Sequence, residues 1–301
     1  MNKTLFTYIL IIGIAGTAGT TTGIVGKKLL GQEIIDYSGF NPELFRGDGK
    51  ALLASYASDP KFIDKCSPAD IVNIGLEKYR QCKNCYSIGT GVASTIVSQT
   101  IRNFQIKNNN KYFEESISYS SMVALANRAI QAGTTGDINL YKGKATGSES
   151  GSYPSEDKGT TYSQEKYKAY LGKTLNEMFI YLISNNSVVT DECEVKRTDN
   201  KGYQVKLTLH PDIATYYYKF QMKNISGLDG LPSFEYVRHT YTFDQYMCLE
   251  TLHVDEKYTA SMGVSVSITN SIDYRYYFEE YLEIPKNNES LDYSIGGSNN
   301  G

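Results

Sequence analysis

The stretch "QCKNC", Gln81 to Cys85, places two cysteines at a spacing that suits zinc binding, disulfide exchange or a structural bridge. A structural zinc site needs four ligands, often as two close pairs, but the chain has one CxxC and three scattered histidines. A thioredoxin-type CxxC begins a helix, whose dipole lowers the thiol pKa. This pair instead follows a predicted helix and precedes a predicted strand, so the pattern favours a structural role.

All five cysteines are candidates for disulfide pairing if the chain is exported, because exported proteins meet an oxidising environment. Cys66 would pair with Cys82 or Cys85 across the ends of the predicted helix. Cys193 would pair with Cys248 between strands. A helix of about 12 residues spans about 18 Å, while a disulfide needs Cα atoms within about 7 Å, which opposes the first pairing. The odd number leaves at least one thiol free.

A second group with chemical potential is His253 with Asp255 and Glu256, whose side chains can transfer protons or bind a metal. On a strand, alternate residues face the same side, so His253 and Asp255 would share a face. A solvated polar face explains this pattern better than a site. The sequence has no nucleophile-elbow, zinc-protease, phosphate-loop or EF-hand motif. We therefore predict a non-enzymatic protein without a cofactor.

Tyrosine is the outlier of the composition, with 26 Tyr and no Trp. It gathers in "ATYYYKF" (214–220) and "DYRYYFEEY" (273–281). Such clusters form either an aromatic surface or cavity for a ligand, or ordinary core with amphipathic edges. The formal charge of −3, from 30 basic and 33 acidic residues, gives no electrostatic reason to expect a nucleic-acid partner.

The first 28 residues predict membrane targeting. Their uncharged stretch, 4–26, is flanked by lysines and is long enough to cross a hydrocarbon core of about 30 Å. Two alternatives remain open. An uncleaved signal anchor would tether the domain outside the cytoplasm through a single span, whereas a signal peptide would release a secreted protein. Ala15, Gly19 and Gly23 form a stripe of small residues through which two membrane helices can make contact.

The rest of the chain predicts an α+β protein, because its strands follow one another without βαβ alternation. We expect an irregular connector over 29–65 and a large antiparallel sheet domain with a few packing helices over 66–285. Within the domain, residues 145–164 are rich in Ser, Gly and Thr, which predicts a mobile surface loop. Residues 286–301 predict a disordered tail.

Local patterns mark individual elements of this domain. Ser67 before Pro68 predicts the N-cap and first position of a helix. Helical patterns also cover 165–184 and 212–224. Apolar and polar residues alternate over 203–209, which predicts a strand with one buried face. Residues 122–131 fit either a strand or a short helix.

The segment 231–254, "LPSFEYVRHTYTFDQYMCLETLHV", resembles the sheet pattern of the LolA and LppX lipoprotein-carrier superfamily. It is also similar to exported proteins of low-GC Gram-positive bacteria. The resemblance covers roughly 68–285 and rests on strand rhythm, so it transfers no functional residue. It implies a curved sheet whose concave face, closed by helices, holds an apolar ligand. The chain lacks the lipobox of the lipid-anchored members.

These observations predict a non-enzymatic, membrane-tethered extracytoplasmic domain that binds an apolar ligand, such as a lipid or a lipoprotein-like molecule. The expected partners are the membrane and either a lipid, an apolar small molecule or an envelope protein. One alternative is a structural envelope or surface protein that acts by protein–protein contact. Another is a hydrolase whose catalytic residues follow none of the motifs considered.

Overall fold

The computed structural model describes residues 39–95, 97–122, 127–134, 138–153, 159–175, 177, 180–226, 228–261, 263, 265–286 and 289–291. The predicted membrane segment, with Ala15, Gly19 and Gly23, lies outside these residues. Within them, no helix combines the length and the apolar character that a membrane span requires.

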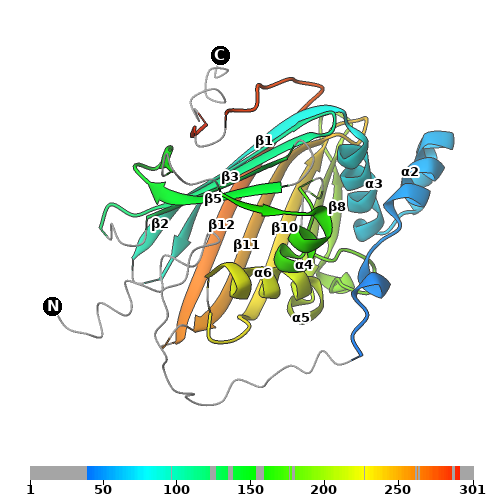
Figure 1. Ribbon diagram of the computed structural model, residues 1–301. Helices are drawn as coiled ribbons and strands as arrows, with labels where there is room; N and C mark the ends of the chain where they lie inside the picture. Colours follow the sequence, from blue (N-terminus) through cyan, green and yellow to red (C-terminus); the bar gives the residue numbers. More distant parts are fainter. Residues whose placement is uncertain are drawn as a thin grey trace.

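The protein is built on one curved antiparallel sheet (Figure 1). Its strands are β1 Asn84–Ser94, β2 Ser98–Asn108, β3 Lys111–Tyr119, β4 Arg128–Thr134, β5 Ile138–Ala145, β6 Gly151–Ser152, β7 Thr160–Tyr162, β8 Glu194–Arg197, β9 Tyr203–Leu209, β10 Ser233–Phe243, β11 Leu249–Ser261 and β12 Ser265–Phe278. The 12 strands lie in the order β6-β5-β4-β3-β2-β1-β12-β11-β10-β9-β8, with β7 paired to β5. The predicted α+β class with a large curved antiparallel sheet is confirmed.

The helices lie before the sheet and between its strands. They are η1 Pro42–Phe45, α2 Gly49–Ser58, η2 Pro60–Lys65, α3 Pro68–Gln81, α4 Gln164–Leu171, η4 Thr190–Glu192, α5 Pro211–Ala214 and α6 Tyr216–Ser226. Figure 1 shows the sheet curving around α4, α5 and α6. We call the face toward these helices the inner face and the opposite one the outer face.

Helix α3 begins where the sequence predicts. The Ser67 hydroxyl accepts a hydrogen bond from the Asp70 amide, and the Asp70 carboxylate accepts one from the Ser67 amide. This capping box and Pro68 at the first turn satisfy or remove the amides that a helix start leaves unpaired. The apolar side of α3, including Ile71, Ile74 and Tyr79, is buried in the main hydrophobic core.

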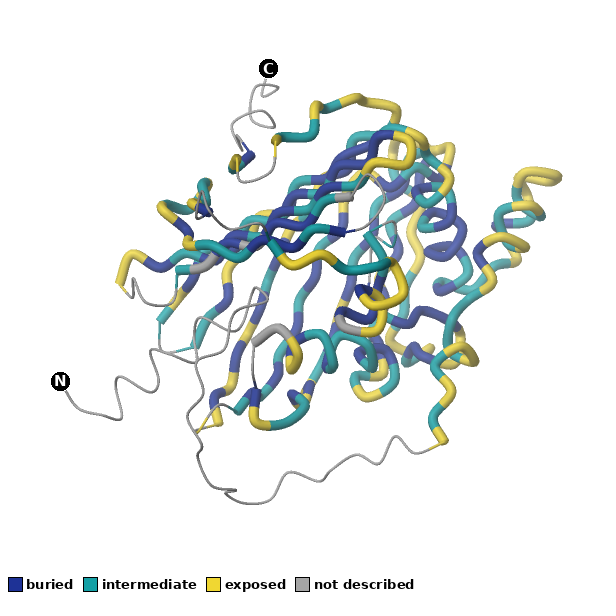
Figure 2. The backbone as a smooth tube through the Cα atoms, viewed as in Figure 1, coloured by how far each residue is buried: buried dark blue, intermediate teal, exposed yellow. Residues whose placement is uncertain are grey.

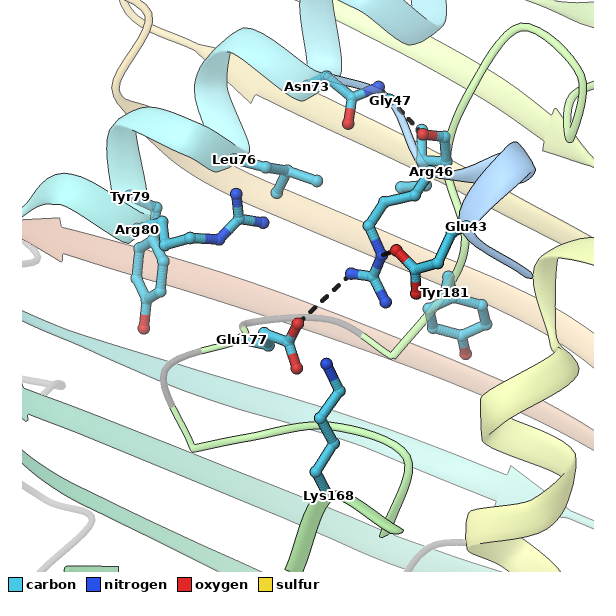
Figure 3. A pocket seen from close by; sticks show the side chains of 11 residues that line it. Glu43, Arg46, Gly47, Asn73, Leu76, Tyr79, Arg80, Lys168, Glu177 and Tyr181 are labelled. Atoms are coloured by element: carbon cyan, nitrogen blue, oxygen red, sulfur yellow. Dashed lines mark hydrogen bonds and ion pairs between the residues drawn. The ribbon is translucent and has the colours of Figure 1, made fainter. Parts of the chain in front are cut away.

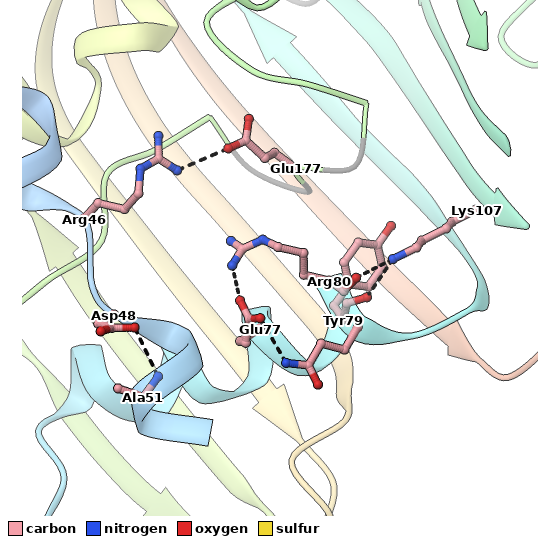
Figure 4. Close-up of polar contacts among 9 residues, drawn as sticks. Arg46, Asp48, Ala51, Glu77, Tyr79, Arg80, Lys107 and Glu177 are labelled. Carbon is pink, nitrogen blue, oxygen red and sulfur yellow. Dashed lines mark hydrogen bonds and ion pairs between the residues drawn. The ribbon is translucent and has the colours of Figure 1, made fainter. Parts of the chain in front are cut away.

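Helix α3 is fixed to the sheet at two points, near its middle and at its C-terminus. Near its middle, Gly75 lies so close to β10 that an added Cβ would be 2.1 Å from Cε1 of Phe243. At its C-terminus, the buried ammonium of Lys107 on β2 donates to the carbonyls of Arg80 (2.6 Å) and Tyr79 (3.5 Å) (Figure 4). A cation at this position also stabilises the negative end of the helix dipole.

The helix predicted over 165–184 is wrong beyond its first half. It ends at Leu171, because Gly172 adopts a left-handed conformation with φ of 74° and caps the helix. The described residues that follow, up to Ser184, form no helix. The helix predicted over 212–224 is present as α5 and α6, which are separated at Thr215.

Two strand predictions can be compared directly with the structure. The alternation over 203–209 appears as β9, whose residues Tyr203, Val205, Leu207 and Leu209 are buried. Residues 128–131, for which strand and helix were both open, belong to β4. The loop predicted over 145–164 contributes the short strands β6 and β7.

The outer face of β1 to β4 is covered by the chain that follows β12 (Figures 1 and 2). Buried Glu115 on this face accepts hydrogen bonds from the Tyr153 hydroxyl (2.9 Å), the Ser290 hydroxyl (3.1 Å) and the Leu291 amide (3.2 Å). Gln131 is its fourth donor (3.3 Å). Ser290 and Leu291 lie in the segment 286–301, for which the sequence predicts disorder, yet they contact the sheet.

The close approach at Gly75 gives a test of the packing. Alanine is normally better than glycine in a helix by roughly 1 kcal/mol. Gly75→Ala should instead destabilise the protein by about 2 kcal/mol, because its methyl group overlaps the Phe243 ring. Urea unfolding followed by circular dichroism measures this. Ala54→Gly, at an exposed site on α2, measures how much the alanine–glycine difference in helix propensity contributes by itself. A more stable Gly75→Ala protein would contradict the packing.

Candidate functional site

A cavity of about 280 Å³ opens among α3, the η1 segment, α4 and residues 177–183 (Figure 3). Its charged lining consists of Arg46, Arg80, Lys168, Glu43 and Glu177. These residues come from segments far apart in the sequence, so no linear motif predicts the cavity. Three basic side chains and two acidic ones line the cavity, and Arg80 also pairs with Glu77 outside the lining, so what matters is which cation stays unpaired.

The basic side chains differ in how far they are neutralised. Arg46 lies 3.4 Å from Glu177 and 3.5 Å from Glu43. Arg80 pairs with buried Glu77, which also accepts from Gln81 Nε2 at 3.0 Å (Figure 4).

Lys168 forms no ion pair with any residue in the described part of the chain. Its side chain points from α4 toward Glu177 and Arg46 (Figure 3). Lys168 is therefore the cation most available to an incoming anion.

Three segments meet at the carbonyl of Ile183 and fix the shape of the cavity. This oxygen accepts hydrogen bonds from the Gly47 amide (2.9 Å) and from Nδ2 of buried Asn73 (3.1 Å). A Cβ on Gly47 would lie 2.3 Å from that Nδ2, so the approach requires glycine. Arg46 is thus held beside α3 by the backbone of its neighbour.

Helix α4, which carries Lys168, is held on the inner face through Glu114 of β3. Nζ of Lys173 lies 2.7 Å from Glu114, and the Tyr167 hydroxyl donates to the same carboxylate at 3.1 Å. The Tyr167 ring is completely buried with Ala132 and Leu140. These contacts fix the wall of the cavity opposite α3.

Beside the cavity lies a fully buried carboxylate, Glu256 of β11. It accepts hydrogen bonds from the hydroxyls of Tyr181 (2.7 Å, at Oε2) and Tyr218 (3.2 Å, at Oε1). Nδ2 of Asn270, its partner on β12, donates to Oε1 at 2.8 Å. Burial raises the pKa of Glu256 despite these three donors. Tyr181 also lines the cavity, so this one side chain lies between the cavity and the Glu256 carboxylate.

A series of aromatic rings in contact with one another begins at the two tyrosines that bind this carboxylate. We call Tyr181, Tyr218, Phe234 and Tyr258 the aromatic cage. Ring centroids are 5.3 Å apart for Tyr181 and Tyr218, 5.5 Å for Tyr218 and Phe234, and 5.0 Å for Phe234 and Tyr258. The tyrosine-rich segment 214–220 therefore supplies α6 with a ring that faces the interior.

Buried His239 of β10 stands at the edge of the aromatic cage. Its ring meets Tyr181 edge to face at 4.6 Å, and its Nδ1 lies 2.8 Å from the Tyr241 hydroxyl. Burial lowers the pKa of His239 from 6.5 to about 3, so the imidazole is neutral near pH 7. His239 Nε2 and Asn270 Oδ1 are buried and have no hydrogen-bond partner among the described residues.

Cys82 and Cys85 follow the end of α3, whose Tyr79 and Arg80 line the cavity, and all five cysteines carry free thiols. Cys82 caps the end of α3, and Cys66 precedes its start. The 14-residue helix is about 21 Å long, which keeps Cys66 far beyond disulfide reach of Cys82. Burial raises the pKa of Cys85 to about 12, so this thiol stays protonated and unreactive.

Cys193 and Cys248 are half-buried, and the Cys193 thiol donates to the Val189 carbonyl at 3.3 Å. Over the described residues, no three His, Cys, Asp or Glu side chains are placed to hold a metal ion.

The group His253, Asp255 and Glu256 is divided between the two faces of β11. His253 lies on the outer face and contacts Asp273 at 2.8 Å, with 43% of its side chain exposed. Asp255 shares that face and accepts from Tyr236, while Glu256 points inward. The sequence signal for Glu256 was its place in the apolar phase of the strand, between Val254 and Tyr258.

Comparison with known proteins leaves the family open. No protein-family model matches the chain. No curated protein matches its sequence. Among solved structures, a DUF1329 family protein from Desulfovibrio piger shares 10% identity over 72% of this chain and 93% of its own, with a TM-score of 0.25.

A LolA superfamily protein from Nitrosomonas europaea shares 8% identity over 74% of this chain and 98% of its own, with a TM-score of 0.27. MucB in complex with MucA shares 8% identity over 70% of this chain and 93% of its own, with a TM-score of 0.17. Likenesses this distant assign neither a family nor a ligand.

The buried imidazole predicts how stability depends on pH. Unfolded His239 gains a proton below its ordinary pKa of 6.5, but the folded protein resists protonation down to about pH 3. The contribution of neutral His239 to the free energy of unfolding is therefore complete above pH 6.5. It is lost as the pH falls toward 3, and the total loss is about 5 kcal/mol. Urea unfolding at several pH values should show that the free energy of unfolding falls less steeply with decreasing pH in His239→Gln than in the natural protein.

Exposed His210 provides the control for this experiment, since His210→Gln should leave the slope unchanged. Parallel loss of stability in His239→Gln and the natural protein would show that His239 is not buried as a neutral group.

Proposed function

We propose that the protein is a non-enzymatic binding protein that holds the acidic group of an amphiphilic ligand in the cavity of its inner face. The observation that carries this proposal is the convergence of Arg46, Arg80 and Lys168 on one small cavity. Lys168, without an ion pair among the described residues, supplies charge that the protein itself leaves available. A guanidinium or ammonium group is the usual partner for a carboxylate or phosphate.

The walls of the cavity suit the apolar part of such a ligand. Leu76, Tyr79 and Ile183 line it beside the charged groups. Its volume of about 280 Å³ accommodates a head group or a short chain, since ligand cavities commonly measure about 300–1,000 Å³. A longer apolar chain would extend beyond it. This refines the apolar ligand expected from the sequence into an amphiphile with an acidic end.

The chemistry of the lining supports binding over catalysis. No histidine, cysteine, serine or aspartate is among the described residues that line the cavity. His239 is buried behind Tyr181 and contacts Tyr241 instead. The carboxylates that could act as bases, Glu43 and Glu177, both lie within 3.5 Å of the Arg46 guanidinium, and Glu177 also accepts from the Thr174 amide at 2.8 Å, which favours a structural role for them.

We further propose that the domain works outside the cytoplasm, tethered to the membrane by its N-terminal segment. The support is the uncharged stretch 4–26 of the sequence.

A structural surface protein would need a contiguous apolar patch. Among the described residues, the exposed large apolar side chains are Leu44, Val92, Met122, Val195, Tyr246 and Tyr281.

Calorimetric titration with octyl phosphate tests this proposal. The protein should bind octyl phosphate and bind octyltrimethylammonium at least tenfold more weakly, because charge-assisted hydrogen bonds contribute about 1.5–3 kcal/mol. Lys168→Glu should lower the affinity for octyl phosphate by tenfold or more. Lys166→Glu makes the same charge change on the same helix but outside the cavity, and should bind normally.

Equal affinity for both amphiphiles, or equal losses in the two lysine variants, would refute the cationic cavity as the binding site. Native mass spectrometry after gentle extraction provides an independent view, because a retained acidic amphiphile would appear as a mass shift that Lys168→Glu abolishes.

A further inference from the structure

The carboxylate of Glu256 is buried without a cation. It is completely inaccessible, and no basic side chain in the described ranges forms an ion pair with it. Its partners are two tyrosine hydroxyls and one amide. A buried charge is costly unless it is paired with an opposite one, so a core needs a reason to keep a carboxylate here.

The acceptor capacity around Glu256 exceeds the donors that the protein supplies. A carboxylate has about four lone-pair positions, of which Tyr181, Tyr218 and Asn270 use three. The unused position is on Oε2, the oxygen that Tyr181 contacts from the side of the cavity. Asn270 Oδ1 is a second buried acceptor with no partner in the described structure. Two neighbouring acceptors call for a ligand rich in N–H donors.

The rings around these acceptors suit a cation. Tyr181, Tyr218, Phe234 and Tyr258 form the aromatic cage, and the negative face of an aromatic ring attracts an ammonium group. A primary ammonium has three N–H donors, whereas a quaternary one has none. The two acceptors therefore favour the primary form.

We propose that Glu256, Asn270 and the aromatic cage form an inner subsite for a primary ammonium group, so that the ligand is a zwitterion. Its acidic group binds Arg46, Arg80 and Lys168 in the cavity, while its ammonium reaches past Tyr181. This inference rests on the proposed function, because the cavity supplies the anion-binding half of the site.

Tyr181 connects the two halves. Its ring lines the cavity and its hydroxyl occupies Glu256 Oε2. When the side chain turns away, the ammonium replaces the phenol as donor to that oxygen, and the charge of Glu256 gains a partner. The neighbouring backbone stays in place, because the Leu182 amide donates to the Ala214 carbonyl at 2.9 Å and Ile183 is held by Gly47. The proposal therefore requires a rotation of the Tyr181 side chain to open the inner subsite.

The experiment compares ω-aminoalkyl phosphates with two, four and six carbons to the matching alkyl phosphates that lack the amine. In the natural protein, the amine should raise affinity about tenfold or more at the chain length that spans both subsites. Glu256→Gln should remove this gain while binding the plain alkyl phosphate as before. Tyr218→Phe provides a second variant, which removes one donor and leaves the carboxylate.

Glu250→Gln is the matched control, because Glu250 lies on the same strand with an exposed side chain. It should keep the full gain from the amine. If the amine adds nothing at any length, or if Glu256→Gln keeps the gain, the inner subsite is refuted while the cationic cavity stands. If the plain alkyl phosphates fail to bind the natural protein, the proposed function itself fails.

Vesicle flotation identifies the source of the zwitterion. Binding to phosphatidylethanolamine vesicles that exceeds binding to phosphatidylcholine vesicles, and that requires Glu256, supports a lipid head group. A gain that is confined to the soluble aminoalkyl phosphates supports a free small molecule with the same chemistry. Equal binding to both vesicle types together with no gain from the soluble amines overturns the inference.

Discussion

The pairing of β1 with β12 is the constraint on which the rest of the structure depends. It joins residues 84–94 to residues 265–278 in ten antiparallel pairs, from Cys85 with Phe278 to Ser94 with Thr269. Without it, β1 to β7 and β8 to β12 would be two separate sheets. Because α3 leads directly into β1, the same pairing brings α3 over β9 and β10. The cavity and the buried carboxylate then lie on one continuous inner face.

Much of this architecture is predictable because it follows local rules. Ser67 and Pro68 define a helix start through capping alone, and the alternation over 203–209 defines a strand through its period. The curved sheet with helices on its inner face agrees with what the resemblance of 231–254 implies. The helix over 165–184 fails because its apolar spacing continues past Gly172, whose positive φ ends it. Tertiary contacts then decide the path of the chain toward Tyr181.

The candidate site is less predictable for a physical reason. Arg46, Arg80, Lys168 and Glu177 are ordinary surface residues in the sequence, and only the fold collects them around one cavity. Glu256 is different, because a carboxylate in the apolar phase of a strand contradicts the local pattern. Such conflicts between a residue and its environment tend to occur at functional sites, where stability is given up for binding. The conflict could have been noticed in the sequence, but its tyrosine and asparagine partners required the structure.

The covering of Glu115 by Ser290 and Leu291 has a consequence for the life of the protein in the cell. Two of the donors to this buried carboxylate are among the last described residues of the chain. A product of premature termination or of carboxypeptidase trimming before Ser290 would leave the charge with fewer donors and would remove Leu291 from the hydrophobic cluster of the outer face. Incomplete chains would thus open more readily than complete ones and would be removed first by quality-control proteases.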